Sequence, residues 1–136
     1  MTLHSERVID PSKFPIWQAP DYSRTSQYLV DKQTCGAKDI SAGLFRLRPG
    51  QKTIPDIHPE SEELYYVVSG QCDLILDNDI FQIVQGMIIY IPAGVTHQSI
   101  NTGEQDLCYF FVFTPPPKEV GPQKDFKKID PEDNKD

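Results

Sequence analysis

The sequence predicts an all-β domain, an antiparallel sandwich or barrel built from short strands. Three observations point to this class. Apolar, β-branched and aromatic segments recur at regular spacing, turn residues separate nearly all of them, and no segment has the period of an amphipathic helix. A chain of 136 residues is long enough for one domain with its own core. Many short antiparallel strands in one domain usually form a sandwich or a barrel.

Residues 1–26 are expected to form an extended arm. Pro11, Pro15 and Pro20 interrupt this stretch, and no clear periodicity runs through it. Its apolar residues, which must pack on something, are Phe14, Ile16 and Trp17. The arm could cover the domain's own sheet or that of a neighbouring subunit, and the sequence leaves both alternatives open.

The strands of the barrel domain are expected between residues 27 and 114. The predicted strands are residues 28–32, 40–48, 63–69, 72–76, 80–84, 87–91, 97–100 and 107–113. The turns between them are indicated by Pro49-Gly50, Ser69-Gly70, Asp77-Asn78-Asp79, Gln85-Gly86, Pro92-Ala93-Gly94 and Asn101-Thr102-Gly103.

Alternation along the strands assigns side chains to faces. Phe45 and Leu47 share one face, and Arg46 and Arg48 share the other. The last strand, residues 107–113, is apolar on both faces. It therefore lies between two layers, or another subunit covers its outer face. Together with the arm, this strand makes a homodimer the expected assembly, with the sheet extended across the interface.

A charged, proline-rich tail is expected to follow the barrel over residues 115–136. Pro115, Pro116 and Pro117 end the last strand, and few apolar residues follow them. We expect this tail to be docked or mobile, and disordered from about Asp130 on.

Charge and cysteine usage exclude several function classes. A net charge of −7 leaves no basic stripe for nucleic acid or an anionic membrane, so a small molecule or a protein is the expected partner. The first residues lack an apolar signal region and no run has the length of a membrane span, which favours a cytoplasmic protein. Cys35, Cys72 and Cys108 have no C-x-x-C spacing and are expected to be reduced, mostly packed thiols.

Two polar clusters stand at the ends of apolar strands. His97 begins a strand directly after the Pro92-Ala93-Gly94 turn. Upstream, Asp56, His58 and Glu63 precede or begin another apolar strand. A carboxylate such as Glu63, pointing by alternation into an apolar barrel, needs a cation or a proton. The two clusters could share one site, although a lone histidine beside a turn is usually only hydrogen bonded.

These clusters resemble the two motifs of the cupin superfamily. The segment Gly86-x5-Pro92-x-Gly94-x2-His97-x3-Asn101 is similar to the second cupin motif at every fixed position. The segment Asp56-x-His58-x4-Glu63-x6-Gly70, preceded by Gly50, resembles the first motif, except that Asp56 stands where the family has its first histidine. The resemblance spans roughly residues 27–113 and implies an antiparallel double-stranded β-helix, the jelly-roll or cupin barrel.

The resemblance also implies a divalent metal. Its ligands would be His58, Glu63 and His97, with Asp56 as a fourth ligand, an acceptor that orients a ligand histidine, or a solvated loop residue. Two histidines and one carboxylate are the facial set of ferrous oxygenases, so Fe(II) or Mn(II) is favoured, with Zn(II) or Ni(II) as alternatives. Glu63, Asp56 or Tyr65 could act as a base beside the metal.

The pocket is expected to take a small organic molecule. Its predicted lining residues are Ser99, Tyr109 and Phe111, with Arg46 and Arg48 as either an anion-binding wall or a charged solvent face. The leading hypothesis is a metal-dependent enzyme, an Fe(II) or Mn(II) oxygenase of the dioxygenase type. The alternatives are a non-redox isomerase, lyase or cyclase, a non-catalytic binding cupin, and a structural protein without metal.

Overall fold

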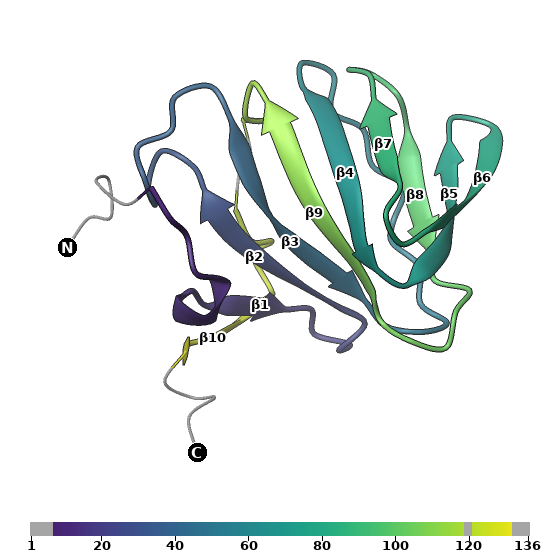
Figure 1. The fold of residues 1–136 in the computed structure, drawn as a ribbon, viewed down its shortest axis with the longest axis horizontal. Coiled ribbons are helices and arrows are strands. Elements are labelled where there is room, and N and C mark those ends of the chain that lie inside the picture. Colours follow the sequence, from purple (N-terminus) through teal and green to yellow (C-terminus); the bar gives the residue numbers. More distant parts are fainter. Residues whose placement is uncertain (1–6, 119–120, 132–136) are drawn as a thin grey trace.

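Two antiparallel sheets face each other across the core and form an open barrel (Figure 1). The computed structural model describes residues 7–118 and 121–131. The larger sheet has the strand order β10-β1-β2-β3-β9-β4-β7, and the smaller has the order β6-β5-β8. The strands are β1 (Ile16–Gln18), β2 (Arg24–Val30), β3 (Ser41–Leu47), β4 (Glu62–Ser69), β5 (Gln71–Leu76), β6 (Asp79–Val84), β7 (Ile88–Ile91), β8 (His97–Ile100), β9 (Leu107–Thr114) and β10 (Lys127–Ile129).

All eight predicted strands are present, so the all-β antiparallel fold class is confirmed. Strand β8 has the predicted bounds, and most others differ by a residue or so. The largest difference is at β2, which begins at Arg24 and ends at Val30, earlier than predicted at both ends. The cause is pairing with β3, which continues to Arg24 opposite Leu47.

The N-terminal arm contains structure that its sequence pattern did not predict. A 3-10 helix, η1 (Pro11–Lys13), begins after Asp10, whose side chain accepts a hydrogen bond from the Ser12 amide. Gln27 Nε2 donates to the carbonyl oxygen of Pro11 at 2.8 Å and ties this helix to β2. Strand β1 then pairs with β2, so the arm packs on the sheet of its own chain.

The C-terminal tail returns to the arm. Lys127–Ile129 pair antiparallel with Ile16–Gln18, and β10 thereby becomes an edge strand of the larger sheet. The described part of the tail is therefore docked rather than free. Residues 132–136, for which disorder was predicted, lie outside the described residues.

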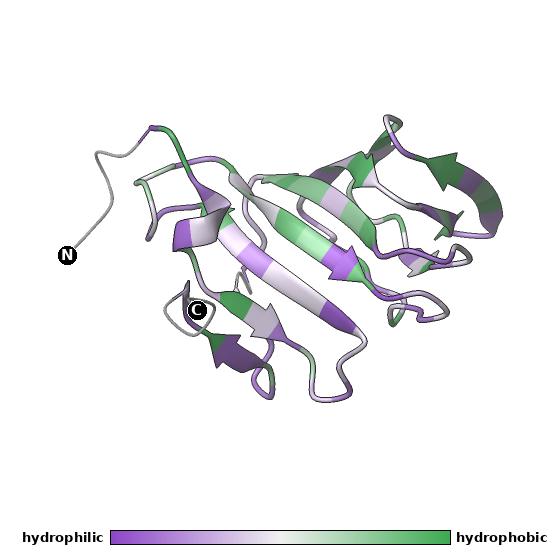
Figure 2. Cartoon of the chain, turned by 60° about the horizontal axis from the view of Figure 1, so that its bottom comes forward, coloured by the Kyte–Doolittle hydropathy of each residue, from purple (hydrophilic) through white to green (hydrophobic). Residues whose placement is uncertain are grey.

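The core lies between the two sheets and is formed by alternate residues of each strand. Leu47, Val67 and Leu107 are fully buried on the inner face of the larger sheet, and Leu74 meets them from β5. In Figure 2 the apolar colouring follows the central strands, whereas β2 is mostly pale with hydrophilic bands. Strand β9 contributes buried rings on its inner face, while Phe110 on its outer face is 38% exposed.

The three cysteines are free thiols, as predicted, and Cys72 and Cys108 are buried. Within the described residues, no helix is long and apolar enough to cross a membrane.

Candidate metal centre

Backbone pairing brings the two polar clusters together. Asp56 and His97 form an antiparallel bridge in which each amide donates to the other residue's carbonyl oxygen at 2.9 Å. The Gly94 amide donates to the carbonyl oxygen of His58 at 3.0 Å, which ties the turn before β8 to the first cluster. Gly94 has a φ of +82°, a conformation that favours glycine and explains its place in the turn. The expectation that both clusters contribute to one site agrees with this arrangement.

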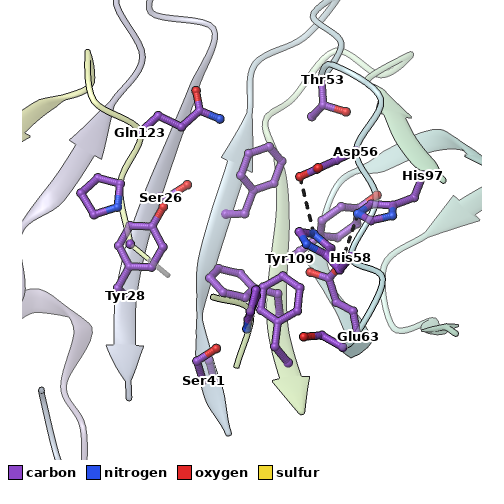
Figure 3. A pocket seen from close by; sticks show the side chains of 18 of the residues that line it. Ser26, Tyr28, Ser41, Thr53, Asp56, His58, Glu63, His97, Tyr109 and Gln123 are labelled. Carbon is purple, nitrogen blue, oxygen red and sulfur yellow. Dashed lines mark ion pairs between the residues drawn. The ribbon is translucent and has the colours of Figure 1, made fainter. Parts of the chain in front are cut away.

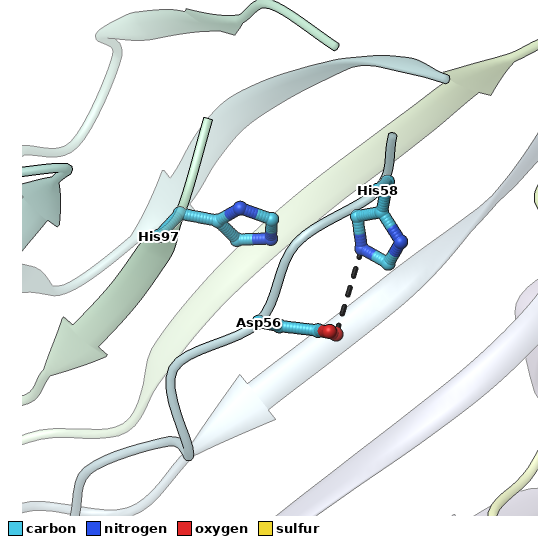
Figure 4. A group of neighbouring side chains, drawn as sticks. All are labelled: Asp56, His58 and His97. Atoms are coloured by element: carbon cyan, nitrogen blue, oxygen red, sulfur yellow. Dashed lines mark ion pairs between the residues drawn. The ribbon is translucent and has the colours of Figure 1, made fainter. Parts of the chain in front are cut away.

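Three donor side chains converge at this point (Figure 4). One ligand atom from each of Asp56, His58 and His97 can be chosen so that all lie within 4.8 Å of one another. His58 Nε2 lies 3.5 Å from Asp56 Oδ2, and the two imidazole rings are 5.2 Å apart between centroids. His97 is buried, whereas the Asp56 side chain is 63% exposed at the rim. This spacing is compatible with one shared cation.

Glu63 lies beneath this group on the inner face of β4. Its Oε1 is 3.4 Å from His97 Nε2, and the residue is only 4% exposed. That oxygen has no hydrogen-bond partner among the residues that the structure describes. Burial, together with the nearby Asp56 carboxylate, raises the pKa of Glu63 to about 9, although a hydrogen bond with Tyr65 acts in the opposite direction.

Hydrogen bonding and burial act on the two imidazoles. His97 Nδ1 lies 3.1 Å from the Val95 carbonyl oxygen, which can accept a hydrogen bond from it, and Nε2 is directed toward Glu63. Burial lowers the pKa of His58, and Asp56 partly offsets this shift. A neutral imidazole is the ligating species.

These residues fit a divalent metal. Two imidazoles and two carboxyl groups are suitable donors for Fe(II), Mn(II) or Zn(II). The unpartnered Oε1 of Glu63 is the strongest sign, because a buried carboxyl oxygen without a partner is costly and a cation would satisfy it. Asp56, His58, Glu63 and His97, the predicted ligands, all line one cavity.

The cavity has a volume of about 950 Å³ and opens above the inner face of the larger sheet. Strands β2, β3, β9 and β4 form its floor, the loop before β4 forms one wall, and parts of the C-terminal tail form the opposite wall. Figure 3 shows Asp56, His58, Glu63 and His97 on one side, and Ser26, Tyr28 and Gln123 across from them. This volume suits a small organic molecule.

Three of the predicted lining residues, Ser99, Tyr109 and Phe111, line this cavity. As alternation predicts, Ser99 points inward, and its Oγ lies 2.9 Å from the Tyr109 hydroxyl. Tyr65 stacks on Tyr109 with ring centroids 4.1 Å apart and reaches the level of Glu63. Cys72 Sγ, 3.0 Å from the Tyr109 hydroxyl, completes a buried polar network below the donor cluster.

Arg46 and Arg48 are not brought to the cavity. Arg46 belongs to the outer face of β3, because Phe45 and Leu47 on either side pack into the core. Both arginines line a separate shallow groove beside η1. The alternative of a charged outer face therefore describes them, and the anion-binding wall that they could have formed is absent from the described cavity.

Several lining residues were not predicted as such. Ser26 and Tyr28 enter from β2 and Ser41 from the start of β3, while Gln123 and Phe126 come from the tail. A period of two along β3 from Leu47 back to Ser41 would have placed Ser41 on the inner face. No local signal could have placed the tail residues, since their position depends on pairing between β10 and the distant β1.

Comparison with known proteins agrees with this fold. Residues 43–113 match the family model described as Cupin domain. Protein SchB of Streptomyces halstedii is 30% identical over 105 residues, which cover 77% of this chain and 73% of SchB. Polyketide synthase CurC of Streptomyces cyaneus is 32% identical over 87 residues, 64% of this chain and 56% of CurC.

Among solved structures, a predicted oxalate decarboxylase from Thermotoga maritima superimposes with a TM-score of 0.71. It is 20% identical, and the match covers 80% of this chain and 99% of that one. At this identity the likeness concerns the fold alone. The chain belongs to the cupin family, as its two motifs predicted, and it has the cupin β-barrel fold.

Proposed function

We propose that this chain is a divalent-metal-dependent cupin enzyme that converts a small organic molecule inside the cavity. The observation that carries the proposal is the buried Glu63 oxygen without a partner, 3.4 Å from Nε2 of His97 and beside a cluster of three further donors. A structural protein has little reason to retain an unsatisfied carboxyl oxygen in its interior.

The residues that would hold the metal are His58 and His97 with Asp56, Glu63 or both. When bound there, a metal would supply Lewis acidity and, in the case of iron, redox chemistry. The chain itself supplies the surroundings. The aromatic side chains on the floor of the cavity exclude water from the reacting molecule. The hydrogen-bond network of Tyr109, Ser99 and Cys72 holds these side chains in place.

An oxygenase that uses Fe(II) or Mn(II) is the first reaction class to test. Two histidines and one carboxylate are available within 4.8 Å in Asp56, His58 and His97. This donor set is the one that leaves positions open for oxygen and substrate in non-haem iron enzymes.

A second candidate is a non-redox isomerase, lyase or cyclase, with Zn(II) or Ni(II) as further metals to consider. It is favoured by the fourth donor, since three of the four residues suffice to hold a metal. Glu63 Oε1 or the exposed Asp56 carboxylate could then give or take a proton, with the Tyr65 hydroxyl close to Glu63. The relative named as a polyketide synthase makes an oxygen-rich polyketide-like molecule a reasonable substrate.

Oxygen uptake and product analysis test the proposal. The protein is purified without chelators, stripped, and reloaded separately with Fe(II), Mn(II), Zn(II) and Ni(II). Each form is then incubated with a panel of phenolic and polyketide-like compounds. Metal-dependent oxygen uptake supports the oxygenase, and metal-dependent conversion without oxygen uptake supports the second candidate. Ligand binding without turnover in any metal form contradicts the enzyme proposal and leaves a binding protein.

A further inference from the structure

Two residues that line the same cavity each contain a buried oxygen without a hydrogen-bond partner among the described residues. These oxygens are Glu63 Oε1 and Ser41 Oγ, and each residue is only 4% exposed. No other buried side-chain nitrogen or oxygen in the described part of the chain lacks a partner. Glu63 belongs to the donor cluster, whereas Ser41 has no role in that cluster.

The sheet register places these two residues in one row. Ser41 of β3 pairs with Phe113 of β9, and Phe113 pairs in turn with Glu63 of β4. Ser41 is therefore two strand spacings from Glu63, about 10 Å across the inner face of the sheet. Figure 3 shows Ser41 beside the cavity and away from Asp56 and His97.

An aromatic surface lies between the two ends. Phe113 occupies the row itself, and the His58 ring packs edge-on against it with centroids 4.8 Å apart. Phe111 in the next row packs edge-on against Phe113 at 5.7 Å and against Tyr28 at 6.3 Å. A flat ring system is the ligand shape that such a surface favours.

Gly43 makes this surface continuous. It pairs with Phe111 and with Tyr28, in the row next to Ser41. A Cβ atom at this position would lie 2.8 Å from Cζ of the Phe111 ring and 1.9 Å from the Gln27 carbonyl oxygen. Only glycine lets the Phe111 ring lie across β3 while β2 stays close.

Ser41 differs from two tyrosine hydroxyls of the cavity. The Tyr109 hydroxyl is bonded to Ser99, and the hydroxyl of Tyr28 is paired with Ser26. These groups are satisfied within the protein. Unlike these two tyrosines, Ser41 can form a hydrogen bond with a ligand at no cost to an existing one.

We propose that the cavity takes a flat aromatic molecule with an oxygen at each end, one at the donor cluster and the other hydrogen bonded to Ser41 Oγ. The span and the aromatic floor fit a bicyclic or tricyclic ring system. Ser41 then selects substrates that carry an oxygen at the end of the ring system remote from the donor cluster. The inference rests on the proposed function only in placing the reacting end at the donor cluster.

Two probes of equal shape test this selection. Anthraflavic acid is a tricyclic anthraquinone with one hydroxyl at each end, and its monohydroxy analogue lacks one of them. Binding of each is measured by titration of the visible absorbance, in metal-loaded and in metal-free protein. We expect wild-type protein to bind the dihydroxy probe about fivefold to tenfold more tightly, the contribution of one hydrogen bond.

Two variants separate Ser41 from the rest of the cavity. Ser41→Ala removes only a hydroxyl that has no partner in the described structure, so the fold is retained and the preference should fall to about onefold. Tyr28→Phe is the matched control, because it removes a cavity hydroxyl that Ser26 already satisfies, and it should keep the preference. Equal binding of both probes to wild type, or an unchanged preference in Ser41→Ala, overturns the inference.

The result of this binding test can be interpreted separately from the test of the proposed function. A Ser41-dependent preference in protein that binds no metal and turns over nothing would support the inference and contradict the enzyme proposal. Metal-dependent turnover without such a preference would do the reverse.

Discussion

Strand β4 carries nearly the same residue types on its two faces, but one face lines the barrel interior and the other faces outward. Its sequence contains three doublets, in each of which one member points into the barrel and the other points out. The inward glutamate, tyrosine and valine are 4%, 9% and 0% exposed, while the outward tyrosine and valine are 44% and 41% exposed. The doublets are Glu62–Glu63, Tyr65–Tyr66 and Val67–Val68.

The difference shows that register, rather than residue type, decides which residue can act. Glu63 lies beside His97 with an unpartnered oxygen, while Glu62 is exposed and accepts a hydrogen bond from the Tyr90 hydroxyl. A slip of one residue in β4 would exchange the two faces completely. The doublets also provide matched controls, because each inward residue has an outward neighbour of the same kind.

The largest effect is expected in the pH dependence of metal-free protein. Folding raises the pKa of Glu63 from 4.5 to about 9, so between these values the folded state holds a proton that the unfolded chain releases. The free energy of unfolding should therefore fall as pH rises from about 5 to about 8, by up to about 1.4 kcal/mol per pH unit. Urea unfolding in the presence of a chelator measures this slope.

Glu63→Gln should flatten this pH dependence, because glutamine does not titrate. Glu62→Gln should leave it unchanged. Equal slopes in wild type and Glu63→Gln would show that Glu63 is ionised in the folded protein.

The same two variants should differ in metal affinity. Whether Glu63 ligates the metal or orients His97, Glu63→Gln should weaken Mn(II) or Zn(II) binding by about 10- to 100-fold. Glu62→Gln should keep the wild-type affinity within about twofold, because its carboxylate lies outside the cavity. Competition with a chelating dye measures both constants, and a similar loss in the two variants would contradict the role of the inner face.

Neighbouring valines test packing on the two faces. Val67→Ala should lower the free energy of unfolding by about 2 kcal/mol, because the side chain is fully buried among Leu47 and Leu107. Val68→Ala should change it by less than about 0.5 kcal/mol. Denaturant unfolding measures both variants, with m-values expected to stay unchanged. Equal losses in the free energy of unfolding would show that the outer face is also covered.

The outer face should affect assembly rather than the site. Its exposed apolar side chains are Leu64, Tyr66 and Val68 of β4, Ile88 and Tyr90 of β7, and Phe110 of β9. They offer roughly 500 Å² per chain, so two copies would bury close to the ~1,000 Å² that a specific interface needs. We propose a homodimer formed by packing of these two faces, as an alternative to the sheet extension that the strand pattern predicts.

Light scattering after size exclusion tests this homodimer. Ile88→Lys should give a monomer with unchanged metal affinity, since Ile88 is 71% exposed and lies on the outer face. Ile80→Lys is the matched control, because Ile80 is 67% exposed on β6, outside this face. A wild-type monomer, or dissociation by both variants, would contradict the proposal.

Most of the barrel could be predicted because its signals are local. Alternation, turn residues and the two cupin motifs suffice to predict the strands from β2 to β9. Strands β1 and β10 could not be predicted, since each has three residues and their pairing joins Ile16 to Ile129. Tertiary pairing of this kind leaves little local trace in a sequence.

The donor cluster was also predictable, but the far end of the cavity was not. Asp56, His58, Glu63 and His97 stand at positions of the two cupin motifs, so the resemblance to that family groups them. Ser41 looks like an ordinary residue at a strand start, and only the register of β3 with β9 shows that it shares a row with Glu63. Arg46 and Arg48 show the reverse case, in which a chemically attractive residue lies on the wrong face.

Elemental analysis tests the central claim most directly. Protein is purified without chelators as wild type, His97→Ala, Asp56→Ala and Glu62→Gln, and the metal content of each is measured by mass spectrometry. We predict near-stoichiometric divalent metal in wild type and Glu62→Gln, and its loss in His97→Ala, with Asp56→Ala showing whether that carboxylate is a ligand. Wild-type protein that stays free of metal even after reconstitution, or His97→Ala that retains it, would contradict the account.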